Sequence, residues 1–214
     1  MGANNGGQEI EIKLQLASAE SGRALLLAAG FAERHPRCLE RNTLFDDPGG
    51  NLRSRGQLVR LRHYGGQVLL TYKTKGADRA GTVDGSRHKH RPELETTVAD
   101  AAPLIAVLQA AGLAPVLRYE KYRTEFAKPG ESGLALLDET PIGTYLELEG
   151  EPEWIDRTAG LLGFSVDQYI TASYLSLNEQ DCLKNGLPVT DMIFDEAETS
   201  EKASGNADNR ERKI

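Results

Sequence analysis

The segment Glu9–Leu16 reads EIEIKLQL. Charged or polar side chains alternate with apolar ones along it, and this period of two predicts a β-strand with one buried face. Because residues two apart on a strand point to the same side, Glu9, Glu11 and Lys13 share a face. The first three positions of that face are all ionic, whereas a solvated face normally mixes uncharged polar residues with charged ones.

The same alternation returns along the chain. Further strands are expected at Phe31–Phe45, Gln57–His63, Gln67–Lys75, Arg91–Val98, Val116–Ala127, Leu134–Glu139 and Thr144–Glu149. Helices are expected at Gly22–Ala29, Ala99–Ala111, Pro152–Leu162 and within Ser165–Leu177, and a Gly-rich loop at Gly76–Ser86. The strands follow one another mostly as hairpins, which favours antiparallel pairing. This order predicts an α+β fold with about eight antiparallel strands and helices packed outside.

Length and composition limit the function classes. A chain of 214 residues with 39% hydrophobic side chains can bury one sizeable core. We expect a flexible N-terminus over 1–8, a single domain over 9–194 and a disordered polar tail over 195–214. The net charge is −7, whereas proteins that bind nucleic acids usually carry an excess of basic residues. No apolar run is long enough for a membrane span, and two cysteines form no disulfide framework, so a cytoplasmic protein is predicted.

The charged residues of the predicted strands form two groups, one basic and one acidic. The basic group is Lys13, Arg60, Arg62, Lys73, Lys121 and Arg123, and the acidic group is Glu9, Glu11, Glu95, Asp138, Glu147 and Glu149. Like charges that share a buried face repel unless counter-ions arrive. Arginine and lysine bind phosphate oxygens, and Mg²⁺ prefers a few carboxylates together with water and phosphate. A polyphosphate bridged to a divalent cation would therefore satisfy both groups.

Less specific interpretations compete with this one. A single strand such as Glu9–Leu16 is more often the solvated face of a sheet. The recurrence of ionic, sign-sorted faces in most of the strands argues against that and favours a closed barrel with a charged lumen. The stretch His88–His90 could bind a transition metal, but no cysteine or third histidine lies nearby, so a solvated loop edge is the better interpretation.

Several motifs together resemble one family. Glu9–Lys13 is similar to the ExExK signature of the CYTH superfamily, the triphosphate tunnel metalloenzymes. The later motifs follow in similar order: RLR at Arg60–Arg62, TYK at Thr71–Lys73, ELE at Glu93–Glu95, EKYR at Glu120–Arg123, LDE at Leu137–Glu139 and YLELEG at Tyr145–Gly150. ExExK alone is a weak motif, but the ordered set is specific. The resemblance implies an eight-stranded antiparallel β-barrel, the triphosphate tunnel, with helices packed outside.

The resemblance also implies roles for residues. Substrate phosphates would be bound by Lys13, Arg60, Arg62, Lys73, Arg91, Lys121 and Arg123. One or two Mg²⁺ or Mn²⁺ ions would be held by Glu9, Glu11, Glu95, Asp138, Glu147 and Glu149. The catalytic groups would be Glu9, Glu11, Lys13 and Lys73. Glu153 and Asp156 fall in the outer helix Pro152–Leu162, where no contribution to the site is expected.

The expected activity is metal-dependent hydrolysis of a triphosphate. Inorganic tripolyphosphate is the leading substrate because no base-recognition motif is visible, with ATP and thiamine triphosphate as further ligands. Three alternatives remain open: a class IV-type adenylyl cyclase that forms cyclic AMP and diphosphate, a thiamine triphosphatase, and a non-catalytic polyphosphate- or nucleotide-binding module. A monomer and a homodimer are both compatible with the resemblance. The family often has a basic residue near a Ser-Tyr pair at the tunnel mouth, and Ser173-Tyr174 lacks one.

Overall fold

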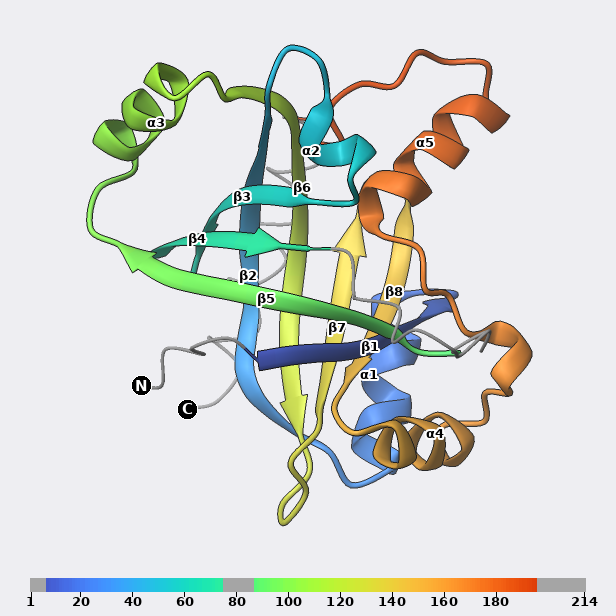
Figure 1. Ribbon diagram of the computed structural model, residues 1–214. Helices are drawn as coiled ribbons and strands as arrows, with labels where there is room; N and C mark the ends of the chain where they lie inside the picture. Colours follow the sequence, from blue (N-terminus) through green and yellow to red (C-terminus); the bar gives the residue numbers. More distant parts are fainter. Residues whose placement is uncertain (1–6, 75–86, 196–214) are drawn as a thin grey trace, which may run out of the picture.

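The computed structural model of the chain describes residues 7–74 and 87–195. Within them, eight antiparallel strands close into a barrel in the order β1-β5-β4-β3-β2-β6-β7-β8 (Figure 1). The strands are β1 Gly7–Leu16, β2 Ala32–Asp46, β3 Leu58–Tyr64, β4 Gln67–Lys73, β5 Lys89–Val98, β6 Ala114–Ala127, β7 Leu134–Thr140 and β8 Gly143–Glu149. The predicted antiparallel barrel with outer helices is thus confirmed. The expected loop Gly76–Ser86 lies outside the described residues, as does the expected tail beyond Asp195.

The helices lie outside the barrel. They are α1 Ala19–Ala28, α2 Asn51–Ser54, α3 Ala101–Ala110, α4 Pro152–Leu161 and α5 Tyr174–Lys184, with the short 3-10 helix η1 at Val166–Gln168. A short helix was expected within Ser165–Leu177, and the 3-10 helix η1 lies there, but the stretch that follows it, Tyr169–Ser173, is not helical. Backbone hydrogen bonds of 2.8 and 2.9 Å join Lys13 and Ile170 and keep that stretch extended, so α5 begins only at Tyr174, after the N-cap Ser173.

The main apolar core lies between the barrel wall and two helices. Helices α1 and α4 lie against the outer side of β1, β7 and β8 (Figure 1). The apolar positions of β1, such as Ile12 and Leu14, are fully buried there beside Trp154 and Ile155 of α4. Each such side chain contributes roughly 1.5–3 kcal/mol when it leaves water. This outer core leaves the opposite face of β1 free to carry charge.

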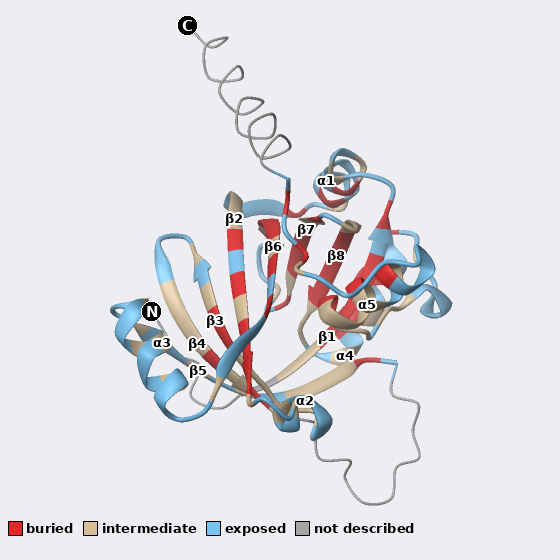
Figure 2. Ribbon diagram, turned by 90° about the horizontal axis from the view of Figure 1, so that it is seen from above, coloured by how far each residue is buried: buried red, intermediate tan, exposed pale blue. Residues whose placement is uncertain are grey.

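A second apolar cluster fills one end of the barrel. It consists of Leu44, Leu117, Tyr119, Tyr145, Tyr174 and Met192. The segment after α5 returns to β6, where Met192 forms a parallel bridge with Tyr119. Figure 2 shows the buried residues concentrated on β2, β6, β7 and β8, whereas α3 is mostly exposed. None of the helices within the described residues is long and apolar enough to cross a membrane.

Candidate active site

The strand register brings the ionic faces together inside the barrel. Lys13 pairs with Glu147 and Glu11 with Glu149 across β1 and β8, and Glu11 also faces Lys89 of β5. Directly opposite residues of neighbouring strands point to the same side of a sheet. Because the intervening apolar residues point to the outer core, these charges point into the lumen.

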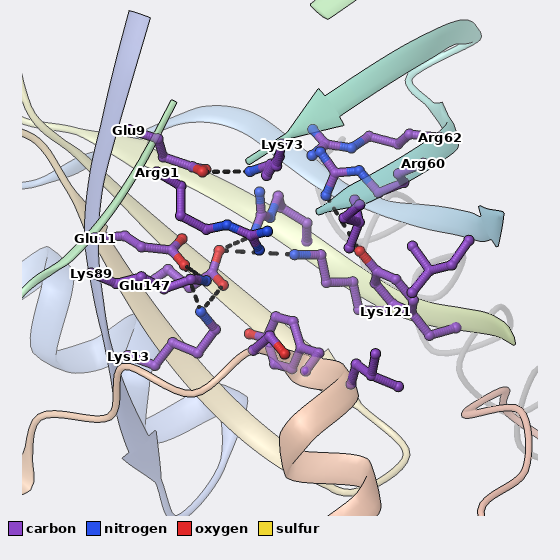
Figure 3. A pocket seen from close by; sticks show the side chains of 17 residues that line it. Glu9, Glu11, Lys13, Arg60, Arg62, Lys73, Lys89, Arg91, Lys121 and Glu147 are labelled. Atoms are coloured by element: carbon purple, nitrogen blue, oxygen red, sulfur yellow. Dashed lines mark hydrogen bonds and ion pairs between the residues drawn. The ribbon is translucent and has the colours of Figure 1, made fainter. Parts of the chain in front are cut away.

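The lumen contains a cavity with a strong excess of positive charge (Figure 3). Its lining includes eight lysine or arginine side chains, but only three glutamates. The basic residues are Lys13, Arg60, Arg62, Lys73, Lys89, Arg91, Lys121 and Arg123, and the glutamates are Glu9, Glu11 and Glu147. Such a lining favours a ligand with several negative charges, because each phosphate can meet more than one cation.

Two arginines of β3 keep unused hydrogen-bond donors in this cavity. Arg60 donates to the hydroxyls of Tyr119 and Thr71, both at 3.3 Å. Arg62 Nε lies 3.8 Å from Glu40 Oε1, which is too far for a hydrogen bond. The buried Nε atoms of both arginines have no hydrogen-bond partner in the described part of the chain. Buried donors without partners are costly, and phosphate oxygens would satisfy them.

Asp138 of β7 holds a second basic pair. Arg123 donates to it twice, at 2.7 and 2.6 Å, and Lys121 Nζ donates at 2.8 Å. The Tyr174 hydroxyl adds a fourth bond at 2.8 Å, and Asp138 is fully buried. Arg123 also contacts Glu147. The carboxylate of Asp138 therefore acts here as the shared counter-ion that orients Lys121 and Arg123.

Tyr174 closes the barrel end where the family's basic residue is missing. Its ring lies 5.1 Å from Lys13 Nζ and 4.9 Å from Lys121 Nζ, within the range of cation–π attraction. Burial and the nearby Asp138 carboxylate raise the pKa of Tyr174 well above its usual value. The hydroxyl therefore remains a donor to Asp138 at neutral pH.

The carboxylates of β1 and β8 share lysines. Glu11 and Glu147 both lie 3.0 Å from Lys13 Nζ, and Lys89 Nζ lies 2.5 Å from Glu11. Lys73 contacts Glu9 in the same way. Burial alone would raise the pKa of Glu11, but Lys13 and Lys89 hold it well below its usual value. Despite the opposing effect of burial, Lys121 and Lys13 likewise lower the pKa of Glu147, so Glu11 and Glu147 are charged at neutral pH and face the cavity.

The donor set fits a hard cation that is bound together with a polyphosphate. Within residues 7–74 and 87–195, no three His, Cys, Asp or Glu side chains converge into a metal-binding group. Mg²⁺ does not require one, because it usually binds one or two carboxylates plus water and phosphate oxygens. Glu9, Glu11 and Glu147 offer such carboxylates beside the basic lining. The stretch His88–His90 forms no such group, because His88 contacts Asp156 instead.

The family model that describes the CYTH domain matches residues 7–160, from β1 into α4. The chain belongs to the CYTH family. The match includes every strand of the barrel, so the resemblance in the motifs extends over the whole lumen. No functionally curated protein has a sequence that matches the chain.

Solved structures share the CYTH fold at low sequence identity. An adenylate cyclase candidate from Vibrio parahaemolyticus is 18% identical, with a TM-score of 0.65 over 82% of this chain and 97% of the other. A protein from Pyrococcus horikoshii is 22% identical, with a TM-score of 0.62 over 79% and 98%. An adenylyl cyclase candidate from Hippeastrum with a dominant triphosphatase activity is 20% identical, with a TM-score of 0.55 over 84% and 97%. At these identities the likeness concerns the fold.

The CYTH lumen brings most of the predicted residues together, but three predicted carboxylates do not line its cavity: Glu95, Asp138 and Glu149. The predicted phosphate-binding residues all line the cavity: Lys13, Arg60, Arg62, Lys73, Arg91, Lys121 and Arg123. Asp138 is enclosed by its basic partners. Glu95 accepts a hydrogen bond of 2.7 Å from Thr71 and lies 3.9 Å from Arg60. Asp138 shares Lys121 and Arg123 with Glu147, whereas Glu95 lies on the Arg60 side of the lumen.

Three charged residues beside the basic lining were missed: Lys89, Glu40 and Glu93, of which Glu93 lies 2.9 Å from Lys73. Lys89 lies two positions before Arg91 on β5, so the period of two could have found it. Glu40 is completely buried on β2 and lies 3.7 Å from Lys121. Burial alone would raise the pKa of Glu40, but Lys121 and Arg62 hold it well below its usual value. Glu40 is therefore a further buried counter-ion of the basic lining.

The acid–base behaviour of Glu149 gives a first testable prediction. Burial, and then the negative charge of Glu9, raise its pKa from 4.5 to about 7. Between these values the folded protein binds more protons than the unfolded one, so the Glu149 contribution to stability falls as pH rises through this window. The contribution is at most about 3 kcal/mol.

We therefore expect Glu149→Gln to raise the melting temperature at pH 8, where wild-type Glu149 is charged, and to change it little at pH 5. Thermal unfolding of both proteins in a metal chelator measures this difference. The exposed Glu153→Gln on α4 is the matched control and should show the same shift at both pH values. An equal shift for Glu149→Gln at pH 5 and pH 8 would contradict the raised pKa.

Proposed function

We propose that this CYTH protein is a metal-dependent triphosphatase whose leading substrate is inorganic tripolyphosphate. The supporting observation is the cavity lined by eight basic side chains and three glutamates. A chain of three phosphates matches this lining better than a single phosphate, because the basic residues come from several strands around the lumen. Hydrolysis would add water across the terminal phosphoanhydride bond and release diphosphate and phosphate.

The basic residues have two tasks in this proposal. Arg60 and Arg62 bind phosphate oxygens with their unused guanidinium donors and fix the chain in the lumen. Lys121 and Arg123, oriented by Asp138, neutralise charge that develops on the transferring phosphoryl group. Preorganised cations of this kind stabilise the transition state without reorganising water.

The acidic residues serve the metal and the water. Glu11 and Glu147 would hold one or two Mg²⁺ or Mn²⁺ ions, with Glu9 and Glu149 completing the set. The bound metal would polarise phosphate oxygens and neutralise their charge. Glu9 or Glu11 accepts the proton of a water aligned with the terminal phosphorus, while the ion pairs with Lys73 and Lys13 orient these carboxylates.

One assay panel tests the proposal. Purified protein is incubated with tripolyphosphate, ATP or thiamine triphosphate, each with Mg²⁺ or Mn²⁺, and phosphate, diphosphate and cyclic AMP are measured. Release of phosphate from tripolyphosphate, dependent on metal, supports the proposal. Cyclic AMP with diphosphate from ATP would instead identify a cyclase. Ligand binding without any turnover would identify a non-catalytic polyphosphate-binding protein.

A second prediction concerns stabilisation by ligands. A ligand that binds only the folded protein stabilises it by about 2.7 kcal/mol at a hundredfold excess over Kd. We expect tripolyphosphate to raise the melting temperature clearly and monophosphate, at the same concentration, to raise it much less. The reason is that only the longer anion can bridge the Arg60 and Lys121 sides of the lumen. Equal shifts from both anions in thermal unfolding would argue against a site for a phosphate chain.

A further inference from the structure

A polar cluster on the outside of the barrel converges on Asp156 of α4. His88 Nε2 lies 2.9 Å from Asp156 Oδ1, and the Tyr169 hydroxyl donates to the same oxygen at 3.1 Å. Arg87 Nη2 donates to Oδ2 at 2.5 Å. The His88 side chain is only 6% exposed. Although burial opposes it, the hydrogen bonds from Arg87 and His88 lower the pKa of Asp156, so this carboxylate is a charged acceptor.

The cluster is attached directly to the lumen. Arg87 and His88 immediately precede β5, and the next residue, Lys89, points into the cavity, where it contacts Glu11. Neighbouring residues of a strand point to opposite faces, so a bond that fixes His88 outside also fixes Lys89 inside. Asp156 therefore fixes His88 on the outside of the barrel, and the adjacent Lys89 points into the cavity.

The other side of the cluster is anchored to β1. Tyr169 precedes Ile170, whose backbone is bonded to Lys13 by two hydrogen bonds. The ladder between β1 and β5 ends at the Glu11–Lys89 pair. On this side of β1, the hydrogen-bond partner is β5 up to Glu11 and Ile170 at Lys13. Asp156 contacts His88, just before β5, and Tyr169, just before Ile170, and so connects the two partners of β1.

We propose that Asp156 is a positioning residue that acts through His88 to place Lys89 against the phosphate chain; this inference rests on the proposed function. Packing of α4 does not depend on Asp156, because Trp154, Ile155, Thr158 and Ala159 are the buried residues of that helix. Loss of the carboxylate should therefore free the start of β5 and leave the helix in place. The sequence alone placed Asp156 on an outer helix without a role.

The test is a double-mutant cycle on the full-length protein. Asp156→Ala, Lys89→Met and the double variant are compared with wild type in kcat/KM for tripolyphosphate and in tripolyphosphate affinity by calorimetry. We expect Asp156→Ala to lower kcat/KM about tenfold, because a small displacement of a positioned group is costly. The double variant should be no worse than Lys89→Met alone, since one group acts through the other. Asp156→Asn, which keeps an acceptor for His88, should recover part of the loss.

The exposed Glu153→Ala on the same helix is the matched control and should match wild type. Losses that multiply in the double variant would show a general effect on the fold and overturn the inference, as would an Asp156→Ala protein as active as Glu153→Ala. If the wild-type protein binds tripolyphosphate without hydrolysing it, the proposed function fails. The double-mutant cycle measured in tripolyphosphate affinity then still tests the role of Asp156. A wild-type protein that neither binds nor hydrolyses this anion overturns both.

Discussion

Replacement of Arg62 by alanine is expected to lower kcat/KM for tripolyphosphate about a hundredfold, or ~2.7 kcal/mol of transition-state stabilisation. The melting temperature should fall only modestly, because Arg62 is one of the cations beside the buried Glu40 and Lys121 remains there. Arg62 lines the cavity, and its Nε atom has no hydrogen-bond partner in the described residues. Its removal does not isolate Glu40, which keeps the hydrogen bond from Asn42 at 2.9 Å. Steady-state kinetics and thermal unfolding of the same preparation measure the two effects.

Arg34→Ala is the control, because Arg34 is exposed on β2 and outside the lumen. Arg62→Lys should recover only part of the activity, since a point charge does not reproduce a bidentate guanidinium. Arg123→Ala should differ from Arg62→Ala in stability as well as in activity, because it removes a partner of the buried Asp138. If Arg62→Ala is as active as Arg34→Ala, Arg62 does not bind the substrate.

The barrel could be predicted because its strands carry two different faces. In β1, the ionic residues Glu11 and Lys13 alternate with the fully buried Ile12 and Leu14. This period of two fixes which side chains point inward before any strand pairing is known. The family resemblance then implied the closed barrel, and all the predicted phosphate-binding residues line its cavity.

What remained hidden depends on contacts between distant segments. Asp138 was expected among the metal ligands, and only the fold reveals that Lys121, Arg123 and Tyr174 all donate to it. The position of Tyr174 beside Lys13 follows from the bridge between Lys13 and Ile170, which joins residues far apart in the chain. Hydrophobic periodicity carries no information on such pairings, because polar contacts depend on register and tertiary packing.

Glu11→Gln is expected to lower kcat at limiting Mg²⁺ by a hundredfold or more, about 2.7 kcal/mol. Glutamine keeps the shape of the side chain and can still accept a hydrogen bond from Lys13, but it loses the anionic oxygen that a hard cation prefers. Because the loss concerns metal binding, part of the rate should return as the Mg²⁺ concentration is raised. Measuring kcat across a series of Mg²⁺ concentrations separates this effect from a lost proton acceptor, which added metal would not restore.

Glu95→Gln is the matched comparison, since it makes the same change within the same barrel. The family resemblance includes Glu95 among the metal ligands, but its carboxylate is hydrogen-bonded to Thr71 and lies on the Arg60 side of the lumen. The two positions differ in how many carboxylates gather there. Besides burial, the charges of Glu9, Glu11 and Glu147 all raise the pKa of Glu149, which faces Glu11, whereas Glu95 faces Thr71 and shares Arg60 with Glu93. Closely apposed carboxylates gain most from a divalent cation, so the metal should bind on the Glu11 side, and Glu95→Gln should lose less than threefold at any Mg²⁺ concentration. Equal, metal-dependent losses in both variants would show that the cation site spans the lumen instead of lying between β1 and β8.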